Sequence, residues 1–207
     1  MKIILLGAAG SGKGTQCEML TKALNIPSIS TGDLFRDNIK NQTPIGIKAQ
    51  SYVNRGVAVP DEVVLTMLKE RLNNPDCKNG YILDGFPRNA NQAKELEKIT
   101  KIDHVFSIEV SKAVLLNRIT GRRICDKCKH NSHIDWLQGK TTCPKCGGSM
   151  LPRKDDSDPE AVKRRLEWYE NDIKPLADYY AKQGILTRIT GDEGKESIFA
   201  QISKVLK

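Results

Sequence analysis

The chain lacks any apolar run long enough to cross a membrane, since none approaches the roughly 20 residues that a membrane helix needs. Its first apolar stretch, Ile3 to Ala9, follows a single lysine and precedes a glycine-rich polar run, so we expect no signal peptide. Internal repeats and low-complexity tracts are also missing from the sequence. We therefore expect a cytoplasmic protein.

Extremes of composition are absent as well. Hydrophobic residues make up 39% and charged residues 28% of the 207 positions, a balance that argues against disorder, collagen-like repeats and coiled coil. No Ser-His-Asp or Cys-His arrangement indicates a nucleophilic enzyme. The formal net charge of +8 instead favours anionic partners such as nucleotides, nucleic acid or acidic lipid.

Short continuous apolar runs alternate with helical periodicity along the chain. The runs predict buried strands at residues 2–6, 81–83, 105–110 and 185–189, with a weaker candidate at 28–30. Helices are predicted at residues 13–24, 61–72, 89–99, 112–120, 159–182 and 195–206, with Pro175 kinking or dividing the fifth. This alternation predicts an α/β fold, a parallel five-stranded sheet flanked by helices.

Two segments interrupt the alternation. Residues 31–60 contain two short predicted helices, 32–40 and 45–54, with no strand between them. Residues 122–154 have almost no helical periodicity and carry four of the six cysteines. Both segments are expected to be insertions on a nucleotide-binding core, where active-site lids usually lie.

The first predicted strand leads into a phosphate-loop motif, GAAGSGKGT, from Gly7 to Thr15. Glycines let successive backbone N–H groups surround a phosphate, the next helix directs its positive end at it, and Lys13 adds a full charge. The motif departs from the common pattern because Gly14 follows the lysine and the hydroxyl comes at Thr15. It predicts a P-loop NTPase-like core that binds a nucleoside triphosphate, against the alternative of a plain helix-initiating turn, and leaves GTPases, ATPases and kinases open.

Acidic and basic residues occupy the positions where such a core would place its chemistry. Asp84 ends the third predicted strand and is expected to hold the waters of a bound Mg²⁺, although it could instead cap the next helix. Arg88 follows Pro87, which fixes the backbone before it. Further arginines border the two insertions: Arg36, Arg118, Arg122, Arg123, Arg153, Arg164 and Arg165. Any one could be a solvated surface residue, but together they predict a clamp for phosphoryl transfer, which requires positive charge and exclusion of water.

The clustered cysteines form two Cys-x-x-Cys pairs, Cys125 with Cys128 and Cys143 with Cys146, separated by fourteen residues. This spacing is typical of a zinc ribbon, in which four thiolates hold a tetrahedral ion. Four cysteine ligands leave no open position, so the metal is expected to be structural. Two disulfides, a ligand set that uses His130 or His133, and iron in place of zinc remain alternatives.

Taken in order, these motifs resemble the adenylate kinases, the ATP:AMP phosphotransferases of the nucleoside monophosphate kinase family, in the form with a zinc-binding lid. The matching stretches are GAAGSGKGT, STGDLFR, the turn at Val57 to Val59, DGFPR followed by Gln92, GRR, RKDD and RRLEWYE leading to Pro175. The resemblance implies reversible Mg²⁺-dependent transfer from ATP to AMP that gives two ADP, by a monomer without nucleic-acid or membrane partners. It also implies a core (residues 1–29, 60–120 and 156–207), an AMP-binding insertion (30–59) and a zinc-binding lid (121–155).

The resemblance also implies roles for individual residues. The catalytic cations would be Lys13, Arg88, Arg122, Arg153 and Arg165. The ATP-binding residues would be Gly10, Ser11, Gly12, Lys13, Gly14, Thr15, Arg118, Arg122, Asn131 and Ser132, with Arg118 stacked on the adenine. The AMP-binding residues would be Thr31, Arg36, Val57, Ala58, Val59, Gly85, Phe86, Pro87, Arg88, Gln92, Arg153 and Arg165, with Gln92 reading the adenine edge. Mg²⁺ would lie near Thr15 and Asp84 through water, and structural zinc would bind Cys125, Cys128, Cys143 and Cys146.

Several positions depart from the family's usual pattern. Ala9 replaces a common proline, Asn89 a common threonine, and Ser132 a common tyrosine near the ATP ribose. One extra residue after RKDD makes Arg164 an alternative to Arg165, which we prefer because it directly precedes a leucine.

Two other functions and one minor expectation follow from the residues. The basic ribbon could bind nucleic acid, although few aromatic residues surround its cysteines. A sister kinase could use CMP or UMP as acceptor, or GTP as donor, although Gln92 and the metal lid favour AMP. Asp155 and Asp156 are expected to form lid salt bridges, because this reaction needs no pair of carboxylates.

Overall fold

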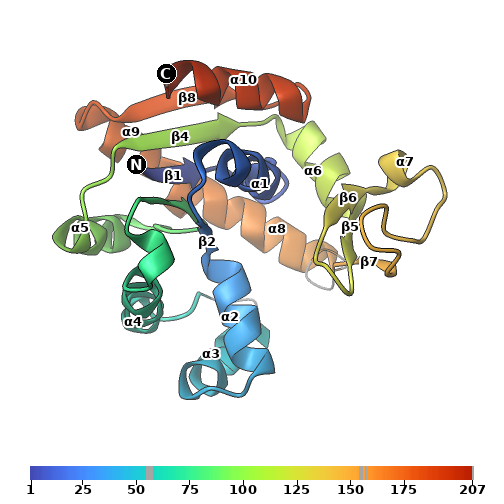
Figure 1. Cartoon of the computed structure of the whole chain (residues 1–207), viewed down its shortest axis with the longest axis horizontal. Helices are drawn as coiled ribbons and strands as arrows, with labels where there is room; N and C mark the ends of the chain where they lie inside the picture. Colours follow the sequence, from blue (N-terminus) through green and yellow to red (C-terminus); the bar gives the residue numbers. More distant parts are fainter. Residues whose placement is uncertain (55–57, 154–155, 157, 207) are drawn as a thin grey trace.

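The structure is a computed structural model that describes residues 1–54, 58–153, 156 and 158–206 (Figure 1). Its main sheet has five strands in the order β2-β3-β1-β4-β8, and all neighbours are parallel. The strands are β1 (Lys2–Leu6), β2 (Ser28–Ser30), β3 (Tyr81–Asp84), β4 (His104–Glu109) and β8 (Leu186–Thr190). All five predicted strands are confirmed, with ends that differ by at most one residue.

Helices cover both faces of this sheet, which explains why its central strands are mostly apolar. Ile4 and Leu6 of β1 pack on the face covered by α4 (Asp61–Leu72), α5 (Ala90–Ile99) and α9 (Pro175–Lys182). Ile3 and Leu5 pack on the opposite face, against α1 (Lys13–Leu24) and α10 (Lys195–Val205). The α6 helix (Lys112–Thr120) follows β4, and a short 3₁₀ turn (Pro75–Cys77) precedes β3. None of the helices in the described part of the chain has the length and apolarity to span a membrane.

The predicted helix over residues 159–182 is divided, as Pro175 led us to expect. An α-helix, α8 (Pro159–Trp168), passes into a π-helical segment (Tyr169–Ile173), and α9 begins at Pro175. The backbone N–H of Lys174 donates to the carbonyl of Tyr169, five residues back, at 2.8 Å. The wider turn therefore lies just where proline cannot continue the regular ladder.

The first insertion consists of α2 (Thr31–Lys40) and α3 (Pro44–Asn54), which extend from the sheet at the bottom of Figure 1. Ser30 caps α2 by accepting a hydrogen bond from the Asp33 backbone N–H at 3.3 Å. The two helices approach closely at Gly46, where an added Cβ would lie 2.1 Å from the Asn38 carbonyl oxygen. The predicted pair of helices is confirmed.

The second insertion, called here the ribbon segment (residues 121–153), lies at the right of Figure 1. It contains an antiparallel sheet in the order β6-β5-β7, formed by β5 (Arg122–Cys125), β6 (Asn131–His133) and β7 (Met150–Pro152). The only helix in its described residues is the four-residue α7 (Ile134–Leu137). Its own core comprises two cysteines, one leucine and one methionine: Cys125, Leu137, Cys143 and Met150. So small a core rarely holds a fold by itself.

Candidate active site

The glycine-rich loop joins the carboxyl end of β1 to α1, where the strand order reverses and open α/β sheets bind their ligands. Gly7, Gly10 and Gly12 have φ values of 153°, 83° and 96°, which other residues rarely adopt. An added Cβ at Gly10 would lie 2.9 Å from the Ile119 side chain. Ser11 is fully buried, and its hydroxyl finds no hydrogen-bond partner in the described structure. The loop therefore combines forced backbone geometry with a buried polar group that a ligand could satisfy.

Lys13 lies folded against this loop. Its Nζ donates to the carbonyl oxygens of Gly7 (2.8 Å) and Ala8 (2.9 Å). Burial lowers the pKa of Lys13, and the nearby charge of Asp84 partly opposes that shift. Asp84 ends β3 in register with Leu5 of β1. The predicted lysine and aspartate are thus close enough to interact at one edge of the sheet.

Arg88 is a second buried cation of the site, on the loop that follows β3. Its Nε donates to the Gly85 carbonyl at 2.7 Å, and its guanidinium carbon lies 5.0 Å from the centre of the Trp168 ring. Burial lowers the pKa of Arg88 to about 10. Asp84 opposes this effect, whereas three neighbouring arginines add to it: Arg165, Arg153 and Arg36. Three of the arginines predicted to form a clamp therefore lie near enough to Arg88 to influence its charge.

Asp156 is the counter-ion of two of the predicted clamp arginines, Arg122 and Arg165. Its carboxylate accepts two hydrogen bonds from Arg122, at 2.6 and 2.7 Å, and one from Arg165 at 2.7 Å. The Asp156 side chain is only 4% exposed. Burial would raise the pKa of Asp156, but its hydrogen bonds and proximity to the two arginines lower it overall. The expected salt bridge of Asp156 is confirmed, while Asp155 lies outside the described residues.

The sequence did not predict that one carboxylate would join two members of the clamp. The available signal was the RKDD stretch, in which two adjacent aspartates lie in the chain between Arg122 and Arg165. The structure also separates the two candidates for the last clamp position. Arg165 is 25% exposed and contacts Asp156, whereas Arg164 is 51% exposed and lies 3.6 Å from Asp158.

The predicted AMP site lies where α2 meets the loop after β3. Thr31 donates through Oγ1 to the Gly85 carbonyl at 2.8 Å. Gly85 has φ 74°, and an added Cβ there would lie 3.1 Å from a nitrogen of Arg88. Arg36 pairs with Asp33 on the same helix. The remaining predicted positions differ in setting: Phe86 is buried, the Phe86–Pro87 peptide is cis, Ala58 is exposed, Val59 packs partly on the core, and Val57 lies outside the described residues.

Gln92 is held at both ends of its carboxamide. Its Nε2 donates to Asp61 Oδ1 at 2.6 Å, and its Oε1 accepts from the Arg88 backbone N–H at 2.8 Å. Asn89 caps α5 by accepting from the Gln92 backbone N–H at 2.8 Å. The alternative role of Asp84 as the cap of this helix is therefore wrong, since Asn89 takes it. Sequence reasoning missed Asp61, because its position at the start of α4 gave no sign of its distant partners.

A cavity of about 720 Å³ separates the ribbon segment from the core. Its lining includes Thr15 from α1 and Asn131 and Ser132 from β6, all three predicted to bind ATP. Two contacts cross it: Lys195 Nζ lies 5.8 Å from the centre of the exposed Trp136 ring, and Lys145 pairs with Glu18 at 3.0 Å.

Arg118, predicted to stack on adenine, instead donates to backbone carbonyl oxygens of the loop that precedes α10. The distances are 3.1 Å to Glu193 and 3.4 Å to Asp192.

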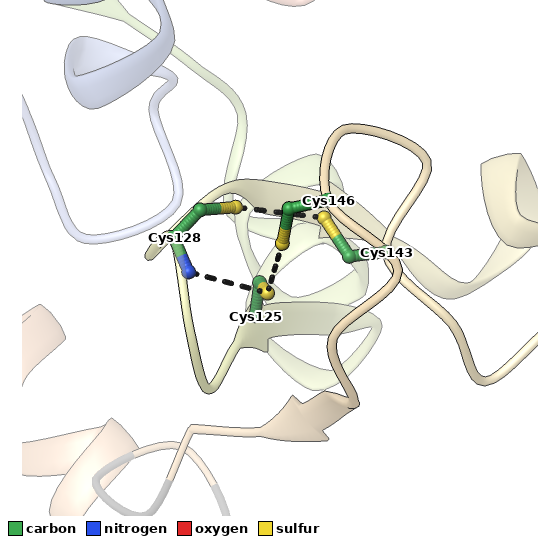
Figure 2. A group of neighbouring side chains, drawn as sticks. All are labelled: Cys125, Cys128, Cys143 and Cys146. Atoms are coloured by element: carbon green, nitrogen blue, oxygen red, sulfur yellow. Dashed lines mark hydrogen bonds between the residues drawn. The ribbon is translucent and has the colours of Figure 1, made fainter.

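The four clustered cysteines converge in the ribbon segment, as Figure 2 shows. All four sulfur atoms lie within 4.8 Å of one another, with Cys125 and Cys146 3.4 Å apart and Cys128 and Cys143 3.6 Å apart. A disulfide would require about 2.05 Å, so the cysteines are free thiols here. Tetrahedral zinc with bonds of about 2.3 Å would place its sulfurs roughly 3.8 Å apart. The donor set and its spacing therefore fit a structural metal ion and support the form of the family with a zinc lid.

Neither histidine considered as an alternative ligand belongs to this cluster. His133 contacts the Asn117 carbonyl through Nε2 at 3.1 Å and caps α7 through Nδ1. His130 lines the cavity beside α1. The four-cysteine set is thus the one that the structure assembles.

A phosphate loop at the switch point of a parallel sheet, beside a ring of arginines, defines the class of P-loop nucleotide-binding enzymes. Within it, this chain belongs to the adenylate kinase family of nucleoside monophosphate kinases: the family's sequence model, Adenylate kinase, matches residues 5–185. The chain is 45% identical to an adenylate kinase of Clostridium tetani, over 100% of this chain and 98% of that protein. It is 46% identical to adenylate kinases of Carboxydothermus hydrogenoformans and Caldicellulosiruptor bescii, over 100% of this chain and 100% and 99% of theirs.

Proposed function

We propose that this chain transfers a phosphoryl group reversibly from Mg²⁺-bound ATP to AMP and so forms two ADP. The observation that carries the proposal is the gathering of Lys13, Arg88, Arg122 and Arg165 around the carboxyl edge of the sheet. Phosphoryl transfer depends on such positive charge and on positioning more than on covalent chemistry by the protein. Membership of the adenylate kinase family supports ATP and AMP as the two nucleotides.

In this proposal the ATP phosphates occupy the glycine-rich loop, including the backbone of Gly10 to Thr15. Lys13 exchanges its two carbonyl partners for phosphate oxygens, a charge-assisted and therefore stronger interaction. The buried Ser11 hydroxyl gains a partner from the same ligand. Mg²⁺, when bound, neutralises phosphate charge, and Thr15 and Asp84 would hold it through water. No general base is needed.

AMP occupies the space between α2 and the loop after β3. Thr31, Arg36, Gly85, Arg88 and Gln92 serve it there, together with the backbone of residues 57–59. Arg122, Arg153 and Arg165 complete the clamp, and the geometry favours Arg165 over Arg164 because Arg165 faces Asp156 and influences Arg88. Asp156 pairs with Arg122 and Arg165 before phosphate arrives, so that these two buried like charges are not left facing one another without a counter-ion.

The ribbon segment acts as the lid. Residues 121–155 close over ATP and residues 30–59 over AMP, while residues 1–29, 60–120 and 156–207 form the core. The Lys145–Glu18 ion pair and the contact of Lys195 with Trp136 are suited to holding the lid against α1 and α10. Closure excludes water from the transferring phosphoryl group.

The metal proposed for the cysteine cluster is zinc, in a structural role. The four thiolates provide the ligand type and spacing that zinc favours, and they leave no open position for catalysis. Elemental analysis of purified protein should give one zinc per chain, and one iron in its place would overturn this assignment. We further propose a cytoplasmic monomer, which sedimentation of the purified chain at enzymatic concentrations would test for oligomeric state.

The decisive test is a coupled assay of ADP formation with ATP and each nucleoside monophosphate in turn. AMP should be the preferred acceptor, and Arg88→Ala, Arg122→Ala and Arg165→Ala should each lower turnover at least about 100-fold, given the 10³ to 10⁵ measured for arginine fingers elsewhere. Arg164→Ala is the matched control and should remain near wild type, since its side chain is half exposed. Preference for CMP or UMP, or normal turnover after all three clamp substitutions, would contradict the proposal.

A further inference from the structure

Gln92 lies in a network whose hydrogen bonds leave it only one orientation. Asp61, the first residue of α4, accepts from the side-chain nitrogens of Asn91 (2.8 Å), Asn89 (3.1 Å) and Gln92 (2.6 Å). The Gln92 side chain is buried, since the residue is 4% exposed. Burial would raise the pKa of Asp61, but these three donors lower it, so the carboxylate stays ionised near neutral pH.

The two ends of the carboxamide meet groups of opposite kind. An ionised carboxylate can only accept, so the end of Gln92 that faces Asp61 must be the NH₂ group. A backbone N–H can only donate, so the end that faces Arg88 must be the carbonyl oxygen. A flipped amide would place donor against donor and acceptor against acceptor, which is costly for buried groups. Within the described residues, these bonds use one of two protons and one of two lone pairs, so one donor and one acceptor remain.

The remaining donor and acceptor match one class of purine. Adenine presents an acceptor at N1 beside a donor at its 6-amino group, which is the complement of an amide held in this way. A 6-oxopurine presents the reverse, a donor at N1 and an acceptor at O6, and would need the flipped amide. A site built with fixed polar groups discriminates strongly against the reversed pattern, because its buried groups would lose their partners.

We propose that Asp61 is a positioning residue that locks the Gln92 carboxamide and so selects 6-aminopurine over 6-oxopurine monophosphates. This inference rests on the proposed function, in which Gln92 reads the base of AMP. Asn89 reinforces the lock from the other side, because it caps the Gln92 backbone while it donates to Asp61. Asp61 itself does not need to touch the nucleotide.

The test is Asp61→Asn, assayed with AMP and with IMP at saturating ATP. An asparagine side chain can present either a donor or an acceptor to Gln92, so the Asp61 end of the lock is lost with little change of shape, while the hydrogen bond from the Arg88 N–H remains. The KM for AMP should rise about tenfold, which corresponds to one or two net hydrogen bonds. Turnover at saturating AMP should change less than about twofold, and the ratio of kcat/KM for AMP to that for IMP should fall about tenfold. An unchanged ratio would overturn the inference.

Two controls separate the lock from other causes. Glu62→Gln removes a charge from the same first turn of α4, and it should leave the AMP to IMP ratio unchanged. Gln92→Ala tests the proposed function itself: if it leaves the KM for AMP unchanged, Gln92 does not read the base. If Gln92→Ala raises the KM but Asp61→Asn leaves the ratio intact, only the lock fails. With Gln92 already replaced by alanine, Asp61→Asn should have no further effect on the ratio, whereas a merely structural role would add one.

A measurement on the wild-type chain keeps the test independent of whether a variant folds. The two side-chain amide protons of Gln92 should give separate NMR signals. The proton hydrogen-bonded to Asp61 should exchange slowly with solvent and keep its chemical shift when AMP is added, while the chemical shift of the other proton changes. Equal changes in the chemical shifts of both protons would overturn the inference.

Discussion

Replacing Asp156 by asparagine tests the electrostatic organisation of the site most sharply among single substitutions. Asp156 is 4% exposed and forms ion pairs with both Arg122 and Arg165, which are 19% and 25% exposed. Removing one partner of a fully buried ion pair costs about 3–5 kcal/mol. Since both arginines retain some contact with water, we expect Asp156→Asn to lower the free energy of unfolding by about 2–3 kcal/mol.

For a protein of this length, that loss corresponds to a thermal midpoint lower by roughly 5–10 °C, measured by calorimetry without nucleotide. Asp158→Asn is the matched control: it lies two residues away, makes only a loose pair with Arg164 at 3.6 Å, and asparagine still caps α8. Its effect should stay within about 0.5 kcal/mol.

The same variant makes a second prediction with a ligand that joins two adenosines through a polyphosphate. Its phosphates should supply the negative charge that the arginines lack, so the ligand should raise the midpoint of Asp156→Asn more than that of wild type. If Asp156→Asn has the same thermal midpoint as wild type, or if the ligand raises both midpoints equally, Asp156 is not the counter-ion of a phosphate-binding clamp.

Three further perturbations follow from the same structure. The pKa of Asp156 is lower in the folded chain than in the unfolded chain, where it is near 3.9. The ionised carboxylate therefore stabilises the fold above that unfolded pKa, and the stabilisation is lost as the pH falls through the folded pKa. The denaturant midpoints of wild type and Asp156→Asn should consequently converge below about pH 4. A chelator that removes the metal proposed for the cysteine cluster should accelerate hydrogen exchange throughout the ribbon segment while the main sheet stays protected, because the segment's own core is so small. Unchanged exchange there would refute a structural metal. Glu18→Gln breaks an ion pair with Lys145 whose partners are both over 40% exposed, so the free energy of lid docking should fall by no more than about 0.5 kcal/mol. Hydrogen exchange in the ribbon segment should become about twofold faster at low salt and should not differ from wild type at high salt.

Most of the fold could be predicted from the sequence because local signals agreed with the global arrangement. Residues 3–6 are apolar at every position, and β1 is buried on both faces by helices that the helical periodicity of the sequence indicated. Pro175 signalled a break in the long helix for a simple covalent reason, its missing N–H. The cysteine spacing likewise predicted a cluster, because two short knuckles can bring four sulfurs together with little help from the rest of the chain.

The sequence was less informative about how site residues are held. Arg122, Arg165 and Asp156 come from different elements, and the carboxylate that joins them is recognisable only once β5 and α8 are placed. Asp61 lies about thirty residues before Gln92, and nothing near it in the chain indicates that partnership. Such contacts depend on tertiary packing, which no local pattern encodes. Resemblance assigned roles to individual residues, but the structure was needed to show what positions them.

The central claim is that cations from separate segments converge on a phosphate that passes between two adenosines. A crystal structure of the chain with an adenosine–polyphosphate–adenosine ligand tests it most directly. We predict that Lys13 Nζ and the guanidinium groups of Arg88, Arg122 and Arg165 lie about 3 Å from oxygens of the bridging phosphates. Those groups directed into solvent, away from the phosphates, would contradict the account.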